Sequence, residues 1–241
     1  MDDIVDMDEF VRSHPVGFCR VPSDIGAMPG VLASARFSAP RRIDLRDYCG
    51  PTEDQGSRPW CAAYAASSWA ENVLWRARDY YEHVSPDWIY SWAKAHDGDP
   101  NGSGTTLTAV LDALRSRGVF SASVCPVRVI HDGGVALKYA LHRFGAVLVG
   151  FDVTDEWYGI RRTTEARDED GNPVVTGRGS PRKIGGHAVL ACGYNETGLV
   201  IQNSWSAGWG LYGFATVAWP EVARTFMYGT VLGNCLNGFT V

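Results

Sequence analysis

A glutamine followed by a cysteine is the first pair in this sequence whose residue types and spacing can do chemistry. Gln55 opens a turn-forming stretch, residues 56–60, and Cys61 follows it at the start of a long amphipathic segment. A thiol at a helix N-terminus lies at the positive end of the peptide dipoles, which favours the thiolate. The side-chain amide of Gln55 can point into the same region. The stretch therefore predicts a nucleophile and half of an oxyanion-binding site.

A thiol nucleophile needs a base, and the second half of the chain supplies His187. Imidazole accepts a proton near neutral pH, and an amide oxygen on its other nitrogen fixes its tautomer. Asn203 follows at the end of the next expected strand, with Trp205 and Trp209 placed to shield that hydrogen bond from water. Taken singly, these residues have structural explanations: Cys61 could be a core cysteine, His187 a hydrogen-bonded strand histidine, and Asn203 a turn cap. Together they predict nucleophilic acyl transfer by Cys61.

The first half of the chain must position the thiol, and its pattern is helical. A helix is expected from Cys61 to about Arg78, with apolar residues at helical spacing that predict a buried stripe. Ser85 and Pro86 mark a second helix start, and Thr105 or Thr106 caps a third helix that ends at Gly118. A further helix is expected over residues 135–144.

The second half of the chain must position the histidine, and its pattern is β. Strands are expected over residues 146–151, 187–194, 198–202 and 213–217, with one earlier strand at 42–46. Residues 161–186 are rich in charge and glycine and predict an exposed hairpin or long loop. An α+β fold of two lobes follows, with a cleft between them in which the thiol faces the imidazole.

The expected domain organisation is an N-terminal arm at 1–40, a mainly helical lobe at 41–145 and a mainly β lobe at 146–241. The arm contains a possible short helix at 8–11 and either lies on the surface, occluding a groove, or is a poorly ordered terminus. The 161–186 loop ends beside His187, so it is either a solvated loop or an element that selects substrate. The other histidines match no motif and are expected to be structural or exposed: His14, His83, His96, His131 and His142.

Glycines near the expected cleft are candidates for contact with a substrate backbone. Gly102 and Gly104 lie in a loop whose glycines either admit a peptide closely or simply connect two helices. With Gly186 and Trp205, they are the candidate substrate-binding residues.

Composition excludes several classes of function. The 241 residues are 45% hydrophobic and 20% charged, with a net charge of −5, which gives no support to nucleic-acid binding. No apolar run is long enough to span a membrane. The acidic N-terminus lacks the pattern of a secretory signal, so a cytoplasmic location is expected. The oligomeric state cannot be inferred.

Cysteine spacing predicts neither a metal site nor a disulfide framework. The six cysteines are Cys19, Cys49, Cys61, Cys125, Cys192 and Cys235, with no CxxC pair and no Cys/His ligand spacing. Free thiols in a reducing compartment are favoured over disulfides. No metal and no organic cofactor are expected.

Three motifs in order resemble the papain-like cysteine peptidases. They are Gln55 with Cys61, residues 186–189 before a Gly-Tyr pair, and Asn203-Ser204-Trp205 followed by the Gly-Trp-Gly of residues 208–210. The resemblance covers roughly residues 41–220. It implies that Cys61 is the nucleophile, His187 the general base and acid, and Asn203 its orienting partner. It also implies that Gln55 and the Cys61 N–H form the oxyanion hole.

The sequence departs from the family pattern at three positions. Arg58 stands where most members have a disulfide cysteine, Ala62 where tryptophan is usual, and Ser206 where glycine is common. In lacking this cysteine, the sequence resembles the intracellular prokaryotic members of the family. The 1–40 segment is shorter than the family's usual inhibitory prosegment.

The resemblance implies a two-lobed fold with a helical left lobe, an antiparallel β-barrel-like right lobe and the active site between them. It implies hydrolysis of peptide bonds in proteins or peptides through an acyl-thioester. Two alternatives stay open. One is another acyl transfer, as in a deamidase, transpeptidase or transglutaminase-like enzyme. The other is a binding module that kept the fold and lost the activity.

Overall fold

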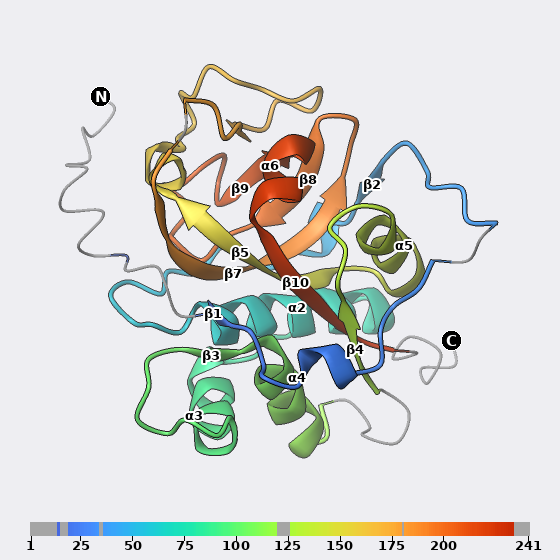
Figure 1. Ribbon diagram of the computed structural model, residues 1–241, viewed down its shortest axis with the longest axis vertical. Helices are drawn as coiled ribbons and strands as arrows, with labels where there is room; N and C mark the ends of the chain where they lie inside the picture. The colour runs from blue at the N-terminus through green and yellow to red at the C-terminus, as the bar shows by residue number, and fades with distance from the viewer. Residues whose placement is uncertain (1–13, 15–18, 34–35, 120–125, 180, 234–241) are drawn as a thin grey trace.

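The computed structural model describes residues 14, 19–33, 36–119, 126–179 and 181–233. Three helices, α2, α3 and α4, gather on one side of the molecule, and most of the β-structure lies on the other (Figure 1). The expected helix at 8–11 lies outside the described residues. The α+β fold expected from the sequence is confirmed.

The helices follow the capping and periodicity signals of the sequence. Ser85 Oγ accepts a hydrogen bond from Asp87 N at 3.3 Å, and Thr106 Oγ1 accepts one from Ala109 N at 3.1 Å. Both are side-chain caps of free helix N–H groups, as predicted. The helices are α2 (Cys61–Arg78), α3 (Pro86–His96), α4 (Leu107–Ser116), α5 (Val135–Phe144) and α6 (Trp219–Thr225).

The strands form an eight-stranded sheet in the order β4-β10-β5-β7-β8-β9-β6, with β2 added to β7, and a separate β1–β3 pair. Within the large sheet every pairing is antiparallel except β6 with β9. The strands are β1 (Cys19–Arg20), β2 (Ile43–Asp44), β3 (Thr105–Thr106), β4 (Val127–Ile130), β5 (Val147–Thr154), β6 (Val174–Val175), β7 (Lys183–Tyr194), β8 (Gly198–Gln202), β9 (Phe214–Ala218) and β10 (Phe226–Leu232).

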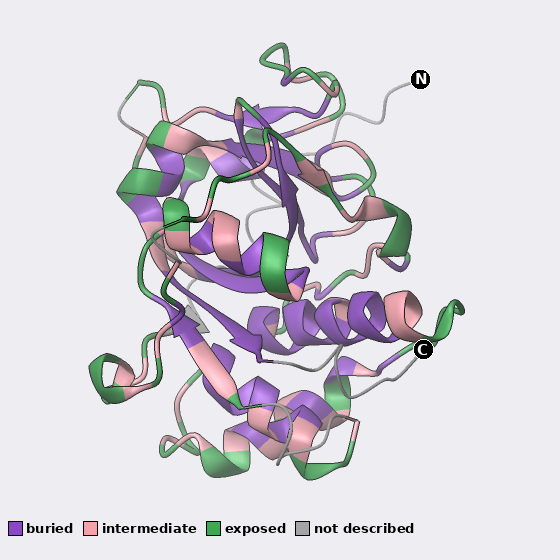
Figure 2. Ribbon diagram, turned by 90° about the vertical axis from the view of Figure 1, so that its right-hand side faces the viewer, coloured by how far each residue is buried: buried purple, intermediate pink, exposed green. Residues whose placement is uncertain are grey.

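The large sheet separates two apolar clusters, which explains the uninterrupted hydrophobic run of β7. Ala188 and Leu190 pack into the cluster around α2, whereas Val189 and Ala191 pack into the cluster on the opposite face. Successive strand residues point to opposite faces, so a strand covered on both sides is apolar throughout. Buried residues accordingly fill both the strands and α2 (Figure 2).

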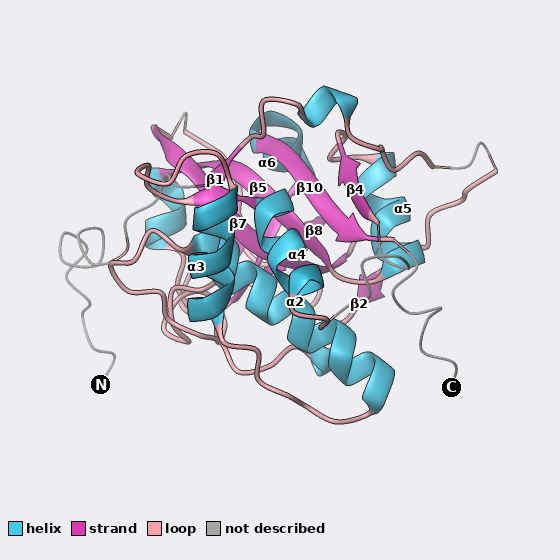
Figure 3. Cartoon of the chain, turned by 90° about the horizontal axis from the view of Figure 1, so that it is seen from below, coloured by secondary structure: helices cyan, strands magenta, loops and turns pink. Residues whose placement is uncertain are grey.

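Helix α2 packs directly against β7, and this contact carries the site. Figure 3 shows α2, α3 and α4 together in front of the sheet. Trp69 on α2 donates a hydrogen bond through Nε1 to Ala146 O at 2.8 Å. This bond ties α2 to the start of β5, the strand that pairs with β7 in the sheet.

Several boundaries differ from those expected. The 42–46 strand is only Ile43–Asp44, and a 3-10 helix, η2 (Arg46–Tyr48), follows it because the chain must turn toward α2. Strand β7 begins at Lys183, inside the predicted 161–186 loop, since it continues to pair with β5. Two further 3-10 helices are η1 (Ile25–Ala27) and η3 (Asp155–Gly159).

The lobe boundaries at residues 40 and 145 stay a prediction. Strands β2 and β4 both lie within 41–145 and both join the large sheet, through β7 and β10. The chain therefore crosses between helices and sheet more than once before residue 146.

Candidate active site

Cys61 is the first residue of α2, and its sulfur lies beside β7. Trp60 precedes it as the N-cap residue. The backbone N–H groups of Ala188, Ala62 and Cys61 lie close enough to the thiol sulfur to act on its pKa. The Ala188 contact brings the sulfur next to the residue that follows His187. The first turn of α2 and the middle of β7 thus share this one atom.

His187 is held by Asn203 through one ring nitrogen. Nε2 lies 2.8 Å from Asn203 Oδ1, and the same oxygen accepts the Ser204 N–H at 2.8 Å. Because this atom accepts from a backbone amide, it is the amide oxygen, so Nε2 carries the proton. His187 Nδ1 is buried and has no hydrogen-bond partner among the described residues. It is therefore an unprotonated acceptor, the state required of a base.

Gln55 is fixed between the α2 turn and the Asn203 segment. Its Nε2 donates to Arg58 O at 3.0 Å, and its Oε1 accepts from Ser204 Oγ at 2.8 Å. Its backbone N–H donates to Ser204 O at 2.9 Å. An amide nitrogen has two N–H groups, so one donor of Gln55 is left after the Arg58 bond. The structure brings Gln55, Cys61, His187 and Asn203 into one connected site.

Aromatic rings enclose the His187–Asn203 bond. The Trp205 ring centroid is 4.6 Å from that of His187, and Trp157 meets the imidazole edge-on at 6.4 Å. Trp209 donates through Nε1 to Trp157 O at 2.7 Å, which fixes the shell. Water is thereby kept from the hydrogen bond that sets the imidazole tautomer.

Burial dominates the charge state of the site. Burial raises the pKa of the Cys61 thiol to about 11, although the three backbone N–H groups act to lower it. Burial also lowers the pKa of His187 to about 4, while its bond to Asn203 acts to raise it. The sequence predicted a favoured thiolate; in this structure the thiol and imidazole are both neutral near pH 7, because desolvation outweighs the helix N-terminus.

His14 was not singled out from the sequence, yet it lies against the site. It is 7% exposed, and its Nε2 is 3.0 Å from Asp54 Oδ1, one residue before Gln55. Tyr158 Oη donates to His14 O at 3.1 Å, and the His14 and Trp205 rings are 6.4 Å apart. Part of the 1–40 segment therefore covers the aromatic shell. A single histidine in the N-terminal arm, outside any motif, gives no sequence signal for this contact.

Glu53 was also missed, because its environment depends on Glu71, which lies in the middle of α2. Burial, and then the charge of Glu71, raise the pKa of the Glu53 carboxyl to about 7. The Glu53 carbonyl accepts the Ser206 N–H at 3.2 Å. This bond ties the residues just before Gln55 to the segment that follows Asn203.

The four candidate substrate-binding residues differ in accessibility. Gly102 and Gly186 are half-buried, Gly104 is buried with φ +69°, and Trp205 is fully buried and stacked on Tyr158. A side chain at Gly102 would collide with the Asp99 carboxylate, so this glycine is required by the loop itself. Substrate contact by these residues stays a prediction.

The 161–186 segment is anchored to the sheet by Asp168. The buried Asp168 carboxylate accepts hydrogen bonds from Asn172 Nδ2 at 2.8 Å, Asn195 Nδ2 at 2.7 Å and Thr216 Oγ1 at 2.6 Å. Asn195 follows β7 and Thr216 lies on β9, so one carboxylate fastens the segment to two parts of the sheet.

The described residues contain no group of three or more histidine, cysteine, aspartate or glutamate side chains placed to hold a metal ion. Across the same residues, no helix combines the length and apolar character needed to cross a membrane.

Comparison with known proteins identifies the fold. No protein-family profile matches the sequence. A 44-residue stretch, 17% of this chain, is 43% identical to an uncharacterized peptidase C1-like protein of Acanthamoeba polyphaga mimivirus and covers 14% of that protein. The match therefore spans about one seventh of the viral protein's length.

Solved structures match over nearly the whole chain. Xylellain, a cysteine protease from Xylella fastidiosa, superposes with a TM-score of 0.68 at 18% identity, covering 92% of this chain and 97% of its own. A procathepsin B from Trypanosoma congolense gives 0.68 at 14% identity, covering 94% and 88%. A digestive procathepsin L from Tenebrio molitor gives 0.66 at 16% identity, covering 95% and 79%. The chain has the papain-like fold of these proteins.

Proposed function

We propose that this chain is a cysteine peptidase that hydrolyses peptide bonds through Cys61, His187, Asn203 and Gln55. The observation that carries the proposal is the His187 imidazole. Asn203 engages its Nε2, while its Nδ1 is buried and has no hydrogen-bond partner among the described residues. The next residue, Ala188, brings its backbone N–H close to the Cys61 sulfur. A base oriented in this way beside a thiol is the arrangement that nucleophilic acyl transfer needs.

The reaction starts from the neutral pair. His187 Nδ1 takes the thiol proton as Cys61 Sγ forms a bond to the substrate carbonyl carbon, whose oxygen becomes an oxyanion. The free N–H of Gln55 Nε2 and the Cys61 backbone N–H stabilise that charge. His187 then gives its proton to the leaving amine, and the C–N bond breaks to leave a thioester on Cys61.

Water completes the cycle. His187 takes a proton from the water that attacks the thioester, and the C–S bond breaks to release the acid and restore the thiol. Asn203 keeps the imidazole in one tautomer through both halves, since its oxygen accepts only from a protonated Nε2. No step requires a cofactor.

The substrate class is a protein or peptide, with Gly102, Gly104, Gly186 and Trp205 as the residues proposed to contact it. Tyr158 and His14 cover Trp205, so its contact requires these groups to move. The described cysteines Cys49, Cys61 and Cys192 are free thiols, which favours the proposed cytoplasmic location.

The test is turnover of casein and of fluorogenic peptides, followed by product mass. We expect wild type to cleave the chain and Cys61→Ala to fold normally with no turnover. A product about one dalton heavier would indicate deamidation, and joined molecules would indicate transfer, which are consequences of the same covalent chemistry. Undiminished cleavage by Cys61→Ala would remove the proposed mechanism.

A further inference from the structure

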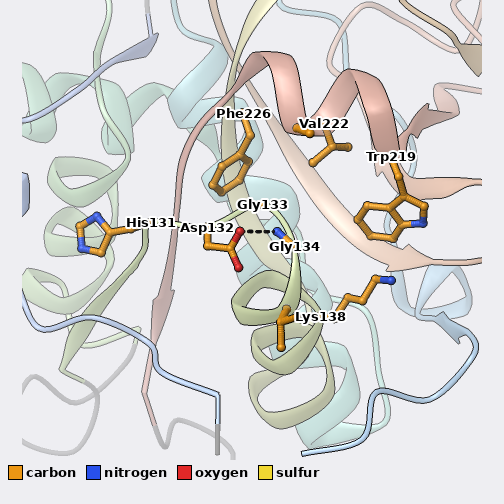
Figure 4. A pocket seen from close by; sticks show the side chains of 10 residues that line it. His131, Asp132, Gly133, Gly134, Lys138, Trp219, Val222 and Phe226 are labelled. Atoms are coloured by element: carbon orange, nitrogen blue, oxygen red, sulfur yellow. Dashed lines mark hydrogen bonds between the residues drawn. The ribbon is translucent and has the colours of Figure 1, made fainter. Parts of the chain in front are cut away.

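A cavity of about 520 Å³ lies between the start of α5 and the α6–β10 corner, and none of its lining residues belongs to the proposed catalytic set. Figure 4 shows the loop before α5 on one side and Val222, Trp219 and Phe226 on the other. Its size is that of a pocket for a small molecule or a single large side chain.

The cavity carries one ammonium group that the described residues leave without a carboxylate partner. Lys138 Nζ lies 4.2 Å from the Trp219 ring and 5.5 Å from the Tyr194 ring. Figure 4 shows the lysine side chain extending toward Trp219. The negative ring faces hold the ammonium in place but do not neutralise it. Its charge is therefore available to an anion.

The carboxylate in the cavity is already engaged by the helix. Asp132 Oδ1 accepts from Gly134 N at 2.9 Å, and Oδ2 accepts from Ala136 N at 3.2 Å. These bonds cap the free N–H groups of α5 and use the favourable end of its dipole. Asp132 thus serves the helix, and Lys138 is the group left to meet a ligand.

Apart from the His131 imidazole, the remaining side chains that line the cavity are apolar. Val222 forms a buried wall, Trp219 and Phe226 are half-buried, and Val135 is 58% exposed at the mouth. At Gly133, a Cβ would lie 3.0 Å from Val222 Cγ1 and 3.1 Å from the Phe226 ring. The glycine lets the loop approach this wall closely, so the cavity offers ring and aliphatic surface next to the Lys138 ammonium, with the His131 imidazole as a further polar group in the lining.

We propose that this cavity binds a carboxylate carried on an apolar, ring-bearing group, with the carboxylate on Lys138 and the ring against Trp219, Val222 and Phe226. Two sources share this chemistry: a free aromatic acid and the C-terminal residue of a peptide. The proposal concerns a second site and does not depend on the proposed peptidase activity.

The test is titration calorimetry on the full chain at low salt, with three probes of one shape. They are 3-phenylpropionate, 3-phenylpropanamide and 3-phenylpropylammonium. We expect the acid to bind at least about fivefold more tightly than the amide, as a charge-assisted contact provides, and the ammonium to bind most weakly. N-acetylphenylalanine and Gly-Gly-Phe serve as peptide-like acids, and tighter binding of either than of phenylpropionate assigns the peptide source.

Variants locate the effect. Lys138→Met keeps the apolar length of the side chain, so the acid and the amide should then bind equally. Lys183→Met, which removes an exposed lysine that pairs with Asp152, should keep the preference for the acid. An aspartate is compatible with the first turn of a helix, so Val135→Asp should leave α5 intact. Its carboxylate should weaken the binding of the acid and not that of the amide. Failure of the acid to bind, equal binding of acid and amide to wild type, or an unchanged preference in Lys138→Met would each overturn the proposal.

Discussion

Burial decides how the proposed nucleophile and base behave at the level of single residues. The Cys61 thiol is 2% exposed and the His187 side chain is fully buried, so each is held in its neutral form. Charge separation therefore has to occur during attack, when the oxyanion and the imidazolium can stabilise each other. The fixed donors of the site act at that moment and need no reorganisation.

The role of Gln55 can be separated from its structural bonds. Gln55→Ala should lower kcat on a fluorogenic peptide by on the order of 100–1,000-fold, because an oxyanion donor is lost. Ser204→Ala is the matched control: it removes the hydroxyl that bonds Gln55 Oε1 but leaves the Gln55 N–H. A loss in Ser204→Ala as large as that in Gln55→Ala would show that Gln55 matters only for the structure of its turn.

At the scale of elements, the site is assembled from the start of α2, the middle of β7 and the segment after β8. The segments that surround it are held by side chains from distant parts of the chain. Asp168 joins the 161–186 segment to β9 and to the turn after β7, and His14 joins the N-terminal segment to the Gln55 turn.

Asp168→Ala should destabilise the fold by about 2–4 kcal/mol, because three side-chain donors lose a buried acceptor. The measurement is urea unfolding at pH 7. Glu165→Ala, an exposed change in the same segment, should shift the free energy of unfolding by less than about 0.5 kcal/mol. Equal stability of the two variants would show that the Asp168 network does not anchor the segment.

His14→Ala should increase the rate at which iodoacetamide labels Cys61. The variant loses the contact between the His14 imidazole and Asp54, so the segment that covers the site should open at a lower free-energy cost. A reduction of about 1 kcal/mol in that cost corresponds to about fivefold faster labelling. Peptide mapping by mass spectrometry assigns the labelled cysteine. His96→Ala, which removes a ring stacked on Trp92, is the control. An unchanged rate would mean that the His14 contact does not limit access.

At the scale of the whole molecule, pH should act on stability through His187. Its folded pKa of about 4 lies below the ordinary value of 6.5, so an unfolded chain binds this proton first as the pH falls. The stability that the neutral ring contributes is full above pH 6.5 and is lost as the pH falls toward 4. The shift corresponds to about 3 kcal/mol in total.

The check is the free energy of unfolding of wild type and of His187→Gln at pH 7 and pH 4.5. Wild type should lose about 2–3 kcal/mol more than the variant over this interval, since glutamine does not titrate. If both proteins lose the same stability, the folded pKa of His187 is not depressed.

The sequence predicted what short segments encode. Ser85, Thr106 and the α2 stripe act within one or two helix turns, so their caps and periodicity are visible locally. The site residues could be proposed because each stands in a short motif, and the papain-like fold expected from them is confirmed. Contacts such as His14 with Asp54 depend on the tertiary structure and leave no local pattern. The neutral state of Cys61 likewise depends on its coverage by β7.

The central claim is that the Cys61 sulfur attacks a peptide carbonyl and becomes acylated. The most direct measurement is intact mass after rapid acid quench of the enzyme with a peptide p-nitrophenyl ester, with the adduct located by peptide mapping. We expect a mass increase equal to the acyl group on the peptide that contains Cys61, and none in Cys61→Ala. Steady release of nitrophenol by both proteins, with no acyl group on Cys61, would contradict the account.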